Sequence, residues 1–108
     1  MKDLDPIIHS QLRLAVLSLL MSMEEADFMF LMEKTGSSTG NLSVQITKLL
    51  EAGYIDVEKT FRNKRPRTVC RMTEAGREAF VAYVATLKQL VAPALDDVVF
   101  PGVMPALC

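Results

Sequence analysis

The chain has 108 residues, half of them hydrophobic, and this length favours a single domain with one core. Its apolar runs fall short of the about 20 residues that a membrane helix needs, and its acidic start lacks the charge pattern of a signal peptide, so we expect a cytoplasmic protein without membrane contact. Cys70 and Cys108 lie far apart in the sequence and predict reduced thiols rather than a disulfide or a metal site.

The net charge of −1 conceals an uneven distribution of charge along the chain. Six basic residues fall between positions 59 and 71, a stretch that contains no Asp or Glu. A local positive field matters more than the net charge for binding a polyanion. The overall charge therefore does not exclude nucleic acid as a partner.

Two helices are predicted in the first third of the chain. Between residues 12 and 23, apolar side chains recur three and four positions apart, and Ser10 is the expected N-cap of this helix. A shorter helix follows, which we expect Asp27 to cap and Gly36 to end. Four methionines near this junction are interpreted as core residues or, alternatively, as the lining of a pocket for an unknown small-molecule effector: Met21, Met23, Met29 and Met32.

A third helix is predicted from an N-cap at Ser37 or Ser38 to Gly53. At about 100° per residue, its leucines and isoleucine gather in one arc. The opposite side consists mostly of short polar residues and glycine, with no acid before Glu51. An ordinary solvated helix face would mix Glu with Lys, so this surface indicates a different role.

Two short strands follow, separated by a basic loop. Residues 54–61 alternate between apolar and polar side chains, and residues 67–72 form a second, β-branched run. Asn63 and Lys64 are turn residues between them, so the pattern predicts an antiparallel hairpin with a basic tip. Pro66 is expected to limit pairing on the return strand and to stiffen the tip.

The last predicted helix starts after Thr73, its expected N-cap, and ends at Pro93. Apolar residues three and four positions apart form a stripe along it. We therefore divide the chain into a domain of residues 1–92 and an apolar, proline-containing tail of residues 93–108. The tail is too hydrophobic for typical disorder, and we expect it to pack, either on its own chain or on a partner subunit.

The order of these elements is that of a winged helix-turn-helix, a mainly α fold with a small β-hairpin and a long terminal helix for dimerisation. A helix fits the major groove of B-form DNA, and a basic hairpin beside it can contact the backbone or the minor groove. The acid-free helix and the basic hairpin are therefore interpreted as two parts of one DNA-facing surface.

Four segments, GNLS, EAGY, KRPRT and MTEAGR, occur in order between Gly40 and Arg77. With their spacing, the chain resembles, over about residues 7–91, the small stand-alone winged helix-turn-helix transcriptional regulators related to the MarR and ArsR groups. This resemblance implies a homodimer that binds operator DNA. It implies that the recognition helix contains Ser38, Thr39, Asn41, Ser43, Gln45 and Lys48, and that the wing contains Arg62, Lys64, Arg65 and Arg67.

Each of these residues also has an ordinary interpretation. Asn41 and Gln45 could bind adenine through two hydrogen bonds, or could simply be solvated. Val44 could touch a thymine methyl group or be a lone apolar surface residue. Arg65 and Arg67 are the preferred candidates for a phosphate or the minor groove. Two further arginines have expected structural roles: Arg71 can pair with Asp56 or Glu58, and Arg77 is expected to pack its helix against the wing.

The first and last predicted helices are expected to supply both core and dimer interface. Two recognition helices about 34 Å apart would then meet a near-palindromic operator, and we expect a repressor. The interface residues predicted on these helices are Leu12, Val16, Leu19, Phe80, Tyr83, Val84, Leu87 and Leu90.

Catalysis, a cofactor and a metal are not expected, because His9 is the only histidine and no catalytic motif is present. The alternative function is a winged helix that binds another protein instead of DNA. The basic tip favours DNA, because a protein-binding wing would more often expose aromatic residues there.

Overall fold

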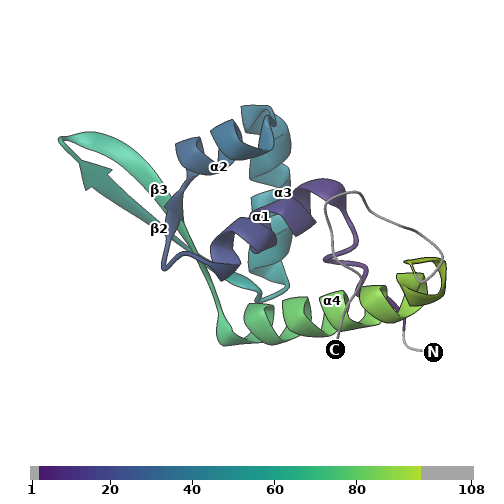
Figure 1. Cartoon of the computed structure of the whole chain (residues 1–108). Helices are drawn as coiled ribbons and strands as arrows, with labels where there is room; N and C mark the ends of the chain where they lie inside the picture. The colour runs from purple at the N-terminus through teal and green to yellow at the C-terminus, as the bar shows by residue number, and fades with distance from the viewer. Residues whose placement is uncertain (1–2, 96–108) are drawn as a thin grey trace.

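Four helices and three strands form the part of the chain that the structure, a computed structural model, describes: residues 3–95 (Figure 1). The predicted mainly α fold with a hairpin and a long last helix is confirmed. No helix in this range is long and apolar enough to cross a membrane. In chain order the elements are α1 (Gln11–Met21), β1 (Ala26–Asp27), α2 (Phe28–Thr35), α3 (Thr39–Glu51), β2 (Ile55–Arg62), β3 (Arg65–Met72) and α4 (Glu74–Leu95).

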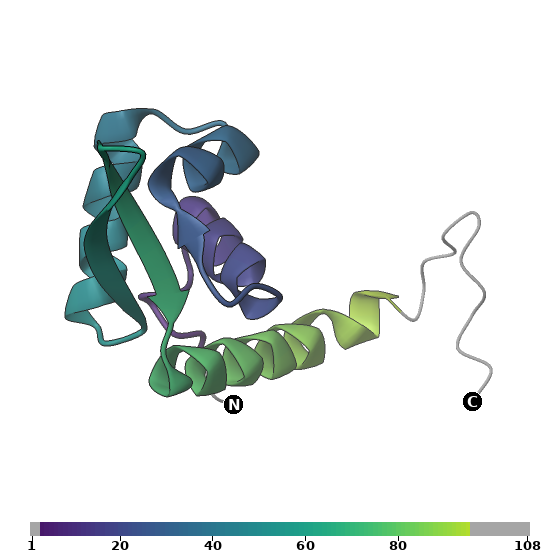
Figure 2. The ribbon, with the colours of Figure 1, turned by 90° about the vertical axis from the view of Figure 1, so that its left-hand side faces the viewer.

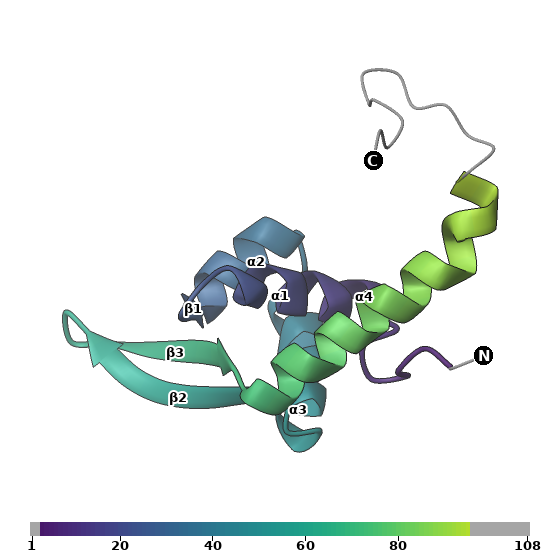
Figure 3. The ribbon, with the colours of Figure 1, turned by 60° about the horizontal axis from the view of Figure 1, so that its bottom comes forward.

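The core lies where α1, α2 and α3 meet, with the base of the hairpin and one side of α4 closing it (Figures 1 and 3). Leu17 and Leu20 of α1 and Leu42 and Leu49 of α3 are fully buried, whereas Leu50, which the periodicity places in the same arc of α3, is 44% exposed. Tyr83 of α4 is also buried, with 4% of its surface exposed. The core therefore fixes the position of α3 against the rest of the domain.

The hairpin is regular and turns in two residues. β2 and β3 pair antiparallel from Ile55 opposite Met72 to Arg62 opposite Arg65. Asn63 and Lys64 both have positive φ, 54° and 66°, which is the geometry that a tight hairpin turn of type I′ requires. The predicted hairpin with Asn63–Lys64 at its turn is confirmed, and its ladder continues through Pro66, which lies opposite Phe61.

A third strand, not predicted from the sequence, extends the sheet on its other side. β1 has two residues and pairs antiparallel with β3, with Ala26 opposite Cys70 and Asp27 opposite Val69. The sheet order is β1-β3-β2. The chain therefore enters α2 directly from an edge of the sheet, and this connects the wing to the helices.

The predicted boundaries of α2 and α3 are confirmed. The side chain of Asp27 accepts a hydrogen bond from the backbone N–H of Phe30 at 2.8 Å, and Gly36 ends α2 in the left-handed conformation, with φ of 66°. Ser38 accepts from the N–H of Asn41 at 3.2 Å. Capping satisfies N–H groups that have no partner in a first helical turn.

One predicted helix start is confirmed in position only, and one predicted helix end is wrong. Ser10 is the N-cap of α1, as expected, but its side chain makes no capping hydrogen bond. α4 continues through Pro93 to Leu95. A proline removes one helical hydrogen bond, to the carbonyl four residues earlier, and here that loss is confined to the last described turn. Residues 96–108 lie outside the described residues, so the division at 92/93 and the packing of the tail stay predictions.

The start of α4 packs closely on the turn between α3 and β2. Thr73 accepts from the N–H of Gly76 at 3.0 Å, which confirms it as the cap, and its hydroxyl donates to the carbonyl of Gly53 at 2.6 Å. A Cβ atom on Gly76 would lie 2.0 Å from the carbonyl oxygen of Tyr54. Only glycine permits this approach of helix to backbone.

We predict that Gly76→Ala lowers the free energy of unfolding by at least about 2 kcal/mol, because α4 must move away from Tyr54. Urea unfolding measures this. Gly40→Ala is the matched control, since Gly40 also lies in a first helical turn but a Cβ there meets nothing within 4 Å. That control should be neutral or stabilising by up to about 1 kcal/mol. Equal effects of the two changes would contradict the close contact.

Candidate nucleic-acid interface

The side of α3 that faces away from the core carries no acid up to Lys48, and Glu51 in the last turn is exposed. Leu42, Ile46 and Leu49 are buried, and the side chains between them are short and polar. Val44, with 52% of its surface exposed, is the one large apolar residue near the middle of this exposed side. Five of the six predicted recognition residues are exposed: Ser38, Thr39, Asn41, Ser43 and Lys48.

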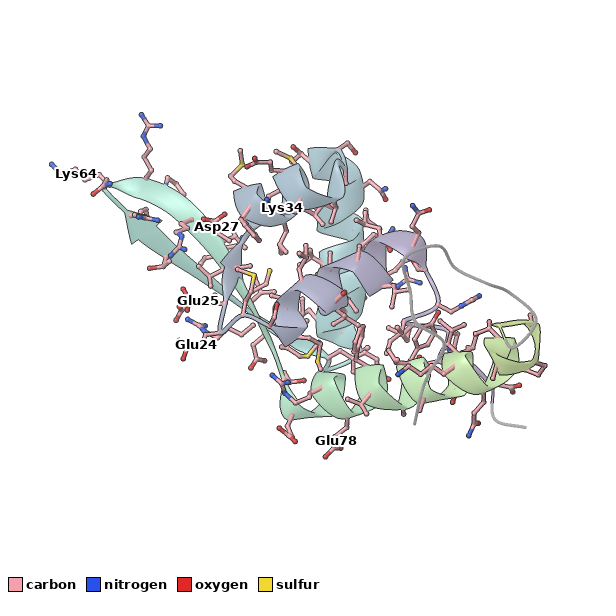
Figure 4. The ribbon with its side chains drawn as sticks, in the orientation of Figure 1. Glu24, Glu25, Asp27, Lys34, Lys64 and Glu78 are labelled. Atoms are coloured by element: carbon pink, nitrogen blue, oxygen red, sulfur yellow. The ribbon has the colours of Figure 1, made fainter. Side chains whose placement is uncertain are left out.

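The tip of the hairpin carries cations that no carboxylate neutralises. Arg62, Lys64 and Arg65 are exposed, and within residues 3–95 none of them forms an ion pair. Figure 4 shows Lys64 projecting from the tip, whereas Glu25 and Asp27 lie further back along the hairpin. The tip is therefore the part of the sheet where positive charge is available to a partner.

The hairpin tip and the N-terminal end of α3 lie at the same end of the molecule, and α4 runs along the opposite end (Figures 1 and 2). An open hollow of about 370 Å³ separates α3 from the hairpin. Thr39, Ser43 and Thr47 line it from α3, and Lys59 and Thr68 line it from the strands. The polar helix and the basic hairpin are therefore neighbours, as one composite surface requires.

Arg67 differs from the other three predicted wing residues because it is paired within the protein. Its Nε lies 3.3 Å from Oδ2 of Asp27 and its Nη1 lies 3.8 Å from Oε2 of Glu25. Only 27% of its side chain is exposed. A phosphate would have to compete with these two carboxylates, so the structure places Arg67 in the attachment of the wing rather than at its free tip.

Arg71 extends the same network toward the base of the hairpin. Its Nη2 donates to Glu25 at 2.8 Å and to Glu58 at 3.2 Å. The predicted pairing with Glu58 is confirmed, whereas Asp56 is not a partner. Hydrogen bonds to Glu58 and then Glu25 raise the pKa of the Arg71 guanidinium. Glu25 was missed from the sequence because it precedes the unpredicted strand β1.

Comparison with known proteins shows which family this architecture represents. Residues 12–91, well over half of the chain, match the model of the winged helix DNA-binding domain. The chain belongs to this family. The predicted winged-helix family is thereby confirmed.

Three relatives of this winged-helix protein illustrate the similarity. The uncharacterized protein MJ0432 of Methanocaldococcus jannaschii is 34% identical over 84 residues, which cover 78% of this chain and 91% of that protein. A transcriptional regulator homologue of Pyrococcus horikoshii has a similar structure, with a TM-score of 0.76, 26% identity, and coverage of 82% of this chain and 87% of its own. The protein smu.1704 of Streptococcus mutans shares the fold, with a TM-score of 0.66, 18% identity, and coverage of 89% and 94%.

Gln45 is the one predicted recognition residue of the winged helix that is half-buried. Its Oε1 accepts a hydrogen bond from Nη1 of Arg13 on α1, and its Nε2 donates to Oδ1 of Asn41 at 3.1 Å. Its position on the flank of α3 therefore couples α1 to the exposed side of the helix.

Two of the predicted dimer residues belong to the core of the single chain. Val16 is fully buried, and Tyr83 is 4% exposed with its hydroxyl 3.0 Å from Nδ1 of His9. Both residues fill the core part of the role expected for these helices, and helix periodicity alone does not separate core from interface positions. The dimer interface itself stays a prediction. Leu90 is 39% exposed, and five further predicted residues are half-buried: Leu12, Leu19, Phe80, Val84 and Leu87.

Two other apolar residues of α4, which were not predicted as interface, are also exposed. Val81 is 54% exposed and Val91 is 37% exposed. An open, mostly apolar hollow of about 340 Å³ lies where the end of α1 meets α4, lined by Met21, Phe80, Val81, Val84, Ala85 and Lys88. This face has no partner among the described residues of the single chain.

Other expectations for single residues have mixed outcomes. Cys70 is buried as predicted. Its burial is the main cause that raises the pKa of its thiol to about 11, and the nearby charge of Asp27 raises it further. The four methionines do not line one pocket, since Met21 and Met29 face different hollows. Arg77 was expected to pack against the wing, but its Nη1 lies 3.7 Å from the sulfur of Met21 at the end of α1.

The carboxylate of Asp27 is held in its charged form by its partners. The N–H of Phe30 is the largest cause that lowers its pKa below the ordinary value of 3.8, and Arg67 lowers it further, although burial opposes both. Because the pKa of Asp27 is lower in the folded chain than in the unfolded chain, the charged carboxylate stabilises the fold at pH values above the pKa of the unfolded chain. This stabilisation is lost as the pH falls through the pKa of the folded chain.

We predict that Asp27→Ala lowers the free energy of unfolding by about 1–2 kcal/mol at neutral pH, because α2 loses its cap and Arg67 loses a partner. The difference from the native protein should shrink as the pH falls below 3.8. Urea unfolding at neutral and acid pH measures both. Asp56→Ala removes an exposed carboxylate from the same hairpin and serves as the control. A difference that stays constant with pH would contradict the charged cap.

Proposed function

We propose that this protein is a transcriptional repressor that binds a near-palindromic operator as a homodimer. One observation carries the proposal: the N-terminal part of α3, whose exposed side carries no acid, and the unpaired cations of the wing tip lie at the same end of the domain. In this proposal α3 enters the major groove, and the wing contacts the backbone or the adjacent minor groove. The expected cytoplasmic location gives access to DNA.

The chemistry of α3 suits the edges of base pairs. Asn41, Ser43 and Lys48 are exposed and carry amide, hydroxyl and ammonium groups that hydrogen-bond in the major groove. Ser38 and Thr39 at the N-terminus lie where backbone N–H groups favour a phosphate. Val44 can contact the methyl group of a thymine.

The wing supplies affinity rather than sequence preference. Arg62, Lys64 and Arg65 would neutralise phosphates, and each phosphate contact releases counterions from the duplex. The ion pairs of Arg67 and Arg71 stabilise the base of the hairpin and so limit how far the tip can move. Binding through the tip therefore requires little reordering of the wing.

Dimerisation through α4 is compatible with this mode of binding. The apolar residues exposed on α4 are Val81, Leu90 and Val91. α4 itself lies at the end of the domain away from the wing tip (Figure 2). Pairing there would leave both copies of α3 open to successive major grooves about 34 Å apart. Occupying an operator in this way obstructs transcription, which is why we propose repression. The hollow beside Met21 is where we would place a small apolar effector.

One observation favours the alternative of a protein-binding module. Phe61 in β2, next to the basic tip, is 74% exposed. A protein partner could cover such an aromatic side chain, but it would not need the three free cations beside it. The dependence of binding on salt separates the two functions, because binding through phosphates weakens steeply as salt increases.

We predict that changing Arg62, Lys64 and Arg65 together to Ala weakens binding to every duplex. The slope of log affinity against log salt should become shallower by up to about 2.7, which is three times about 0.9 per phosphate. Fluorescence anisotropy across a salt series measures this slope. Lys88→Ala removes an exposed cation from α4 and should leave the slope unchanged. An unchanged slope in the triple variant would reject the wing as a DNA contact.

We predict that the protein sediments as a dimer of about 24 kDa, twice 12.0 kDa, at tens of micromolar. Val81→Glu should convert it to a monomer, because a buried charge without a partner destabilises an interface. Val44→Glu is the matched control, since Val44 is 52% exposed and Val81 is 54% exposed. That control should keep the dimer but lose DNA binding. A native protein of 12.0 kDa would contradict the dimer.

A further inference from the structure

Arg13 is a half-buried cation on α1 that forms no ion pair with any residue in the described range. Its Nε donates to the carbonyl of Ile7 at 2.5 Å, and its Nη2 donates to the carbonyl of Pro6 at 3.5 Å. The segment before α1 therefore holds the guanidinium in place. From this position, Nη1 donates to Oε1 of Gln45 on α3.

The chemistry of the guanidinium fixes the direction of this contact. Arginine carries N–H donors and no acceptor, so the atom of Gln45 that faces Arg13 must be the amide oxygen. The amide nitrogen of Gln45 then faces Asn41, one helical turn earlier, at 3.1 Å. Because that nitrogen is also a donor, the atom of Asn41 that meets it must be Oδ1. Arg13 thus determines the orientation of two amides in sequence.

The exposed residue at the end of this chain is Asn41. Its oxygen is turned toward Gln45, and the two N–H groups of Nδ2 remain available to DNA. A freely rotating asparagine pairs with adenine by accepting from N6 and donating to N7. With its oxygen turned along the helix toward Gln45, Asn41 presents its Nδ2 donors to a base. Donors are matched better by guanine, whose major-groove edge has two acceptors, N7 and O6.

We propose that Arg13 is a specificity-determining residue that acts through Gln45 to orient Asn41 toward guanine in place of adenine. This proposal rests on the proposed function, because it requires α3 to lie in the major groove. It differs from the two-bond adenine contacts expected for Asn41 and Gln45 from the sequence. Arg13 itself acts from behind α3 and is a positioning residue.

The test compares guanine with adenine at each position of a half-site. Duplexes bound by the full chain are selected from a random pool, and the Kd is then measured for the selected site and for single G·C to A·T exchanges. At one position per half-site, the native protein should prefer guanine by at least about fivefold. Asn41→Ala should abolish this preference. Arg13→Met and Gln45→Met should each move the ratio of the Kd for adenine to the Kd for guanine toward one.

Lys48→Met is the matched control, because it removes the same charge as Arg13→Met from a residue outside the hydrogen-bonded chain. It should weaken binding but keep the guanine preference at the position that Asn41→Ala affects. A preference for adenine at the position that Asn41→Ala affects would overturn the proposal, as would a guanine preference that Arg13→Met leaves intact. If the native protein binds no duplex, the proposed function itself fails.

The free protein provides a readout that does not require DNA. Arg13→Met should shift the side-chain amide resonances of both Gln45 and Asn41 in a nitrogen–proton correlation spectrum, since both amides lose their fixed orientation. Lys48→Met should leave both signals in place. If the Asn41 amide signals do not move when Arg13 is changed, the two residues are not coupled and the proposal is wrong.

Discussion

The contact between Asp27 and Arg67 joins the helix-turn-helix to the wing. Asp27 accepts from the N–H of Phe30, which starts α2, and from Arg67, which lies in β3. The same residue pairs with β3 through its backbone, opposite Val69. One short segment therefore sets where α2 begins and where the hairpin lies. Since α3 packs on α2 and α1, the position of the wing relative to α3 depends on this junction.

The distribution of charge along the hairpin follows from the same junction. Near its base, Glu25, Asp27 and Glu58 pair with Arg67 and Arg71, so the basic residues there stabilise the protein (Figure 4). The tip extends beyond the reach of β1, and its cations remain unpaired within the described range. The acid-free basic stretch of residues 59–71 is thus divided into an anchored half and a free half. The free half lies at the same end of the molecule as the start of α3 (Figures 1 and 2).

The sequence predicted those features that depend on local pattern. The caps at Asp27, Ser38 and Thr73 and the turn at Asn63–Lys64 were found because each depends on neighbouring residues. β1 was missed because a two-residue strand has no periodicity. The sequence could not show that Arg67 is paired while Arg65 is free, because residues two apart lie on the same side of a strand. Only the position of β1 in the folded chain, next to Arg67, distinguishes the two. The coupling of Arg13 to Gln45 likewise joins residues 32 positions apart.

The central claim is that α3 and the wing tip meet one duplex together. Titration of the full chain with a short duplex at low salt, followed by backbone amide chemical shifts, tests it most directly. We expect the signals of Asn41, Val44 and Lys48 to move together with those of Arg62 and Arg65 at one common stoichiometry. Signals around Glu78 of α4, which lies on the other side of the domain in Figure 4, should stay in place. Shifts confined to α4, or to α3 without the wing, would contradict a composite DNA-binding surface.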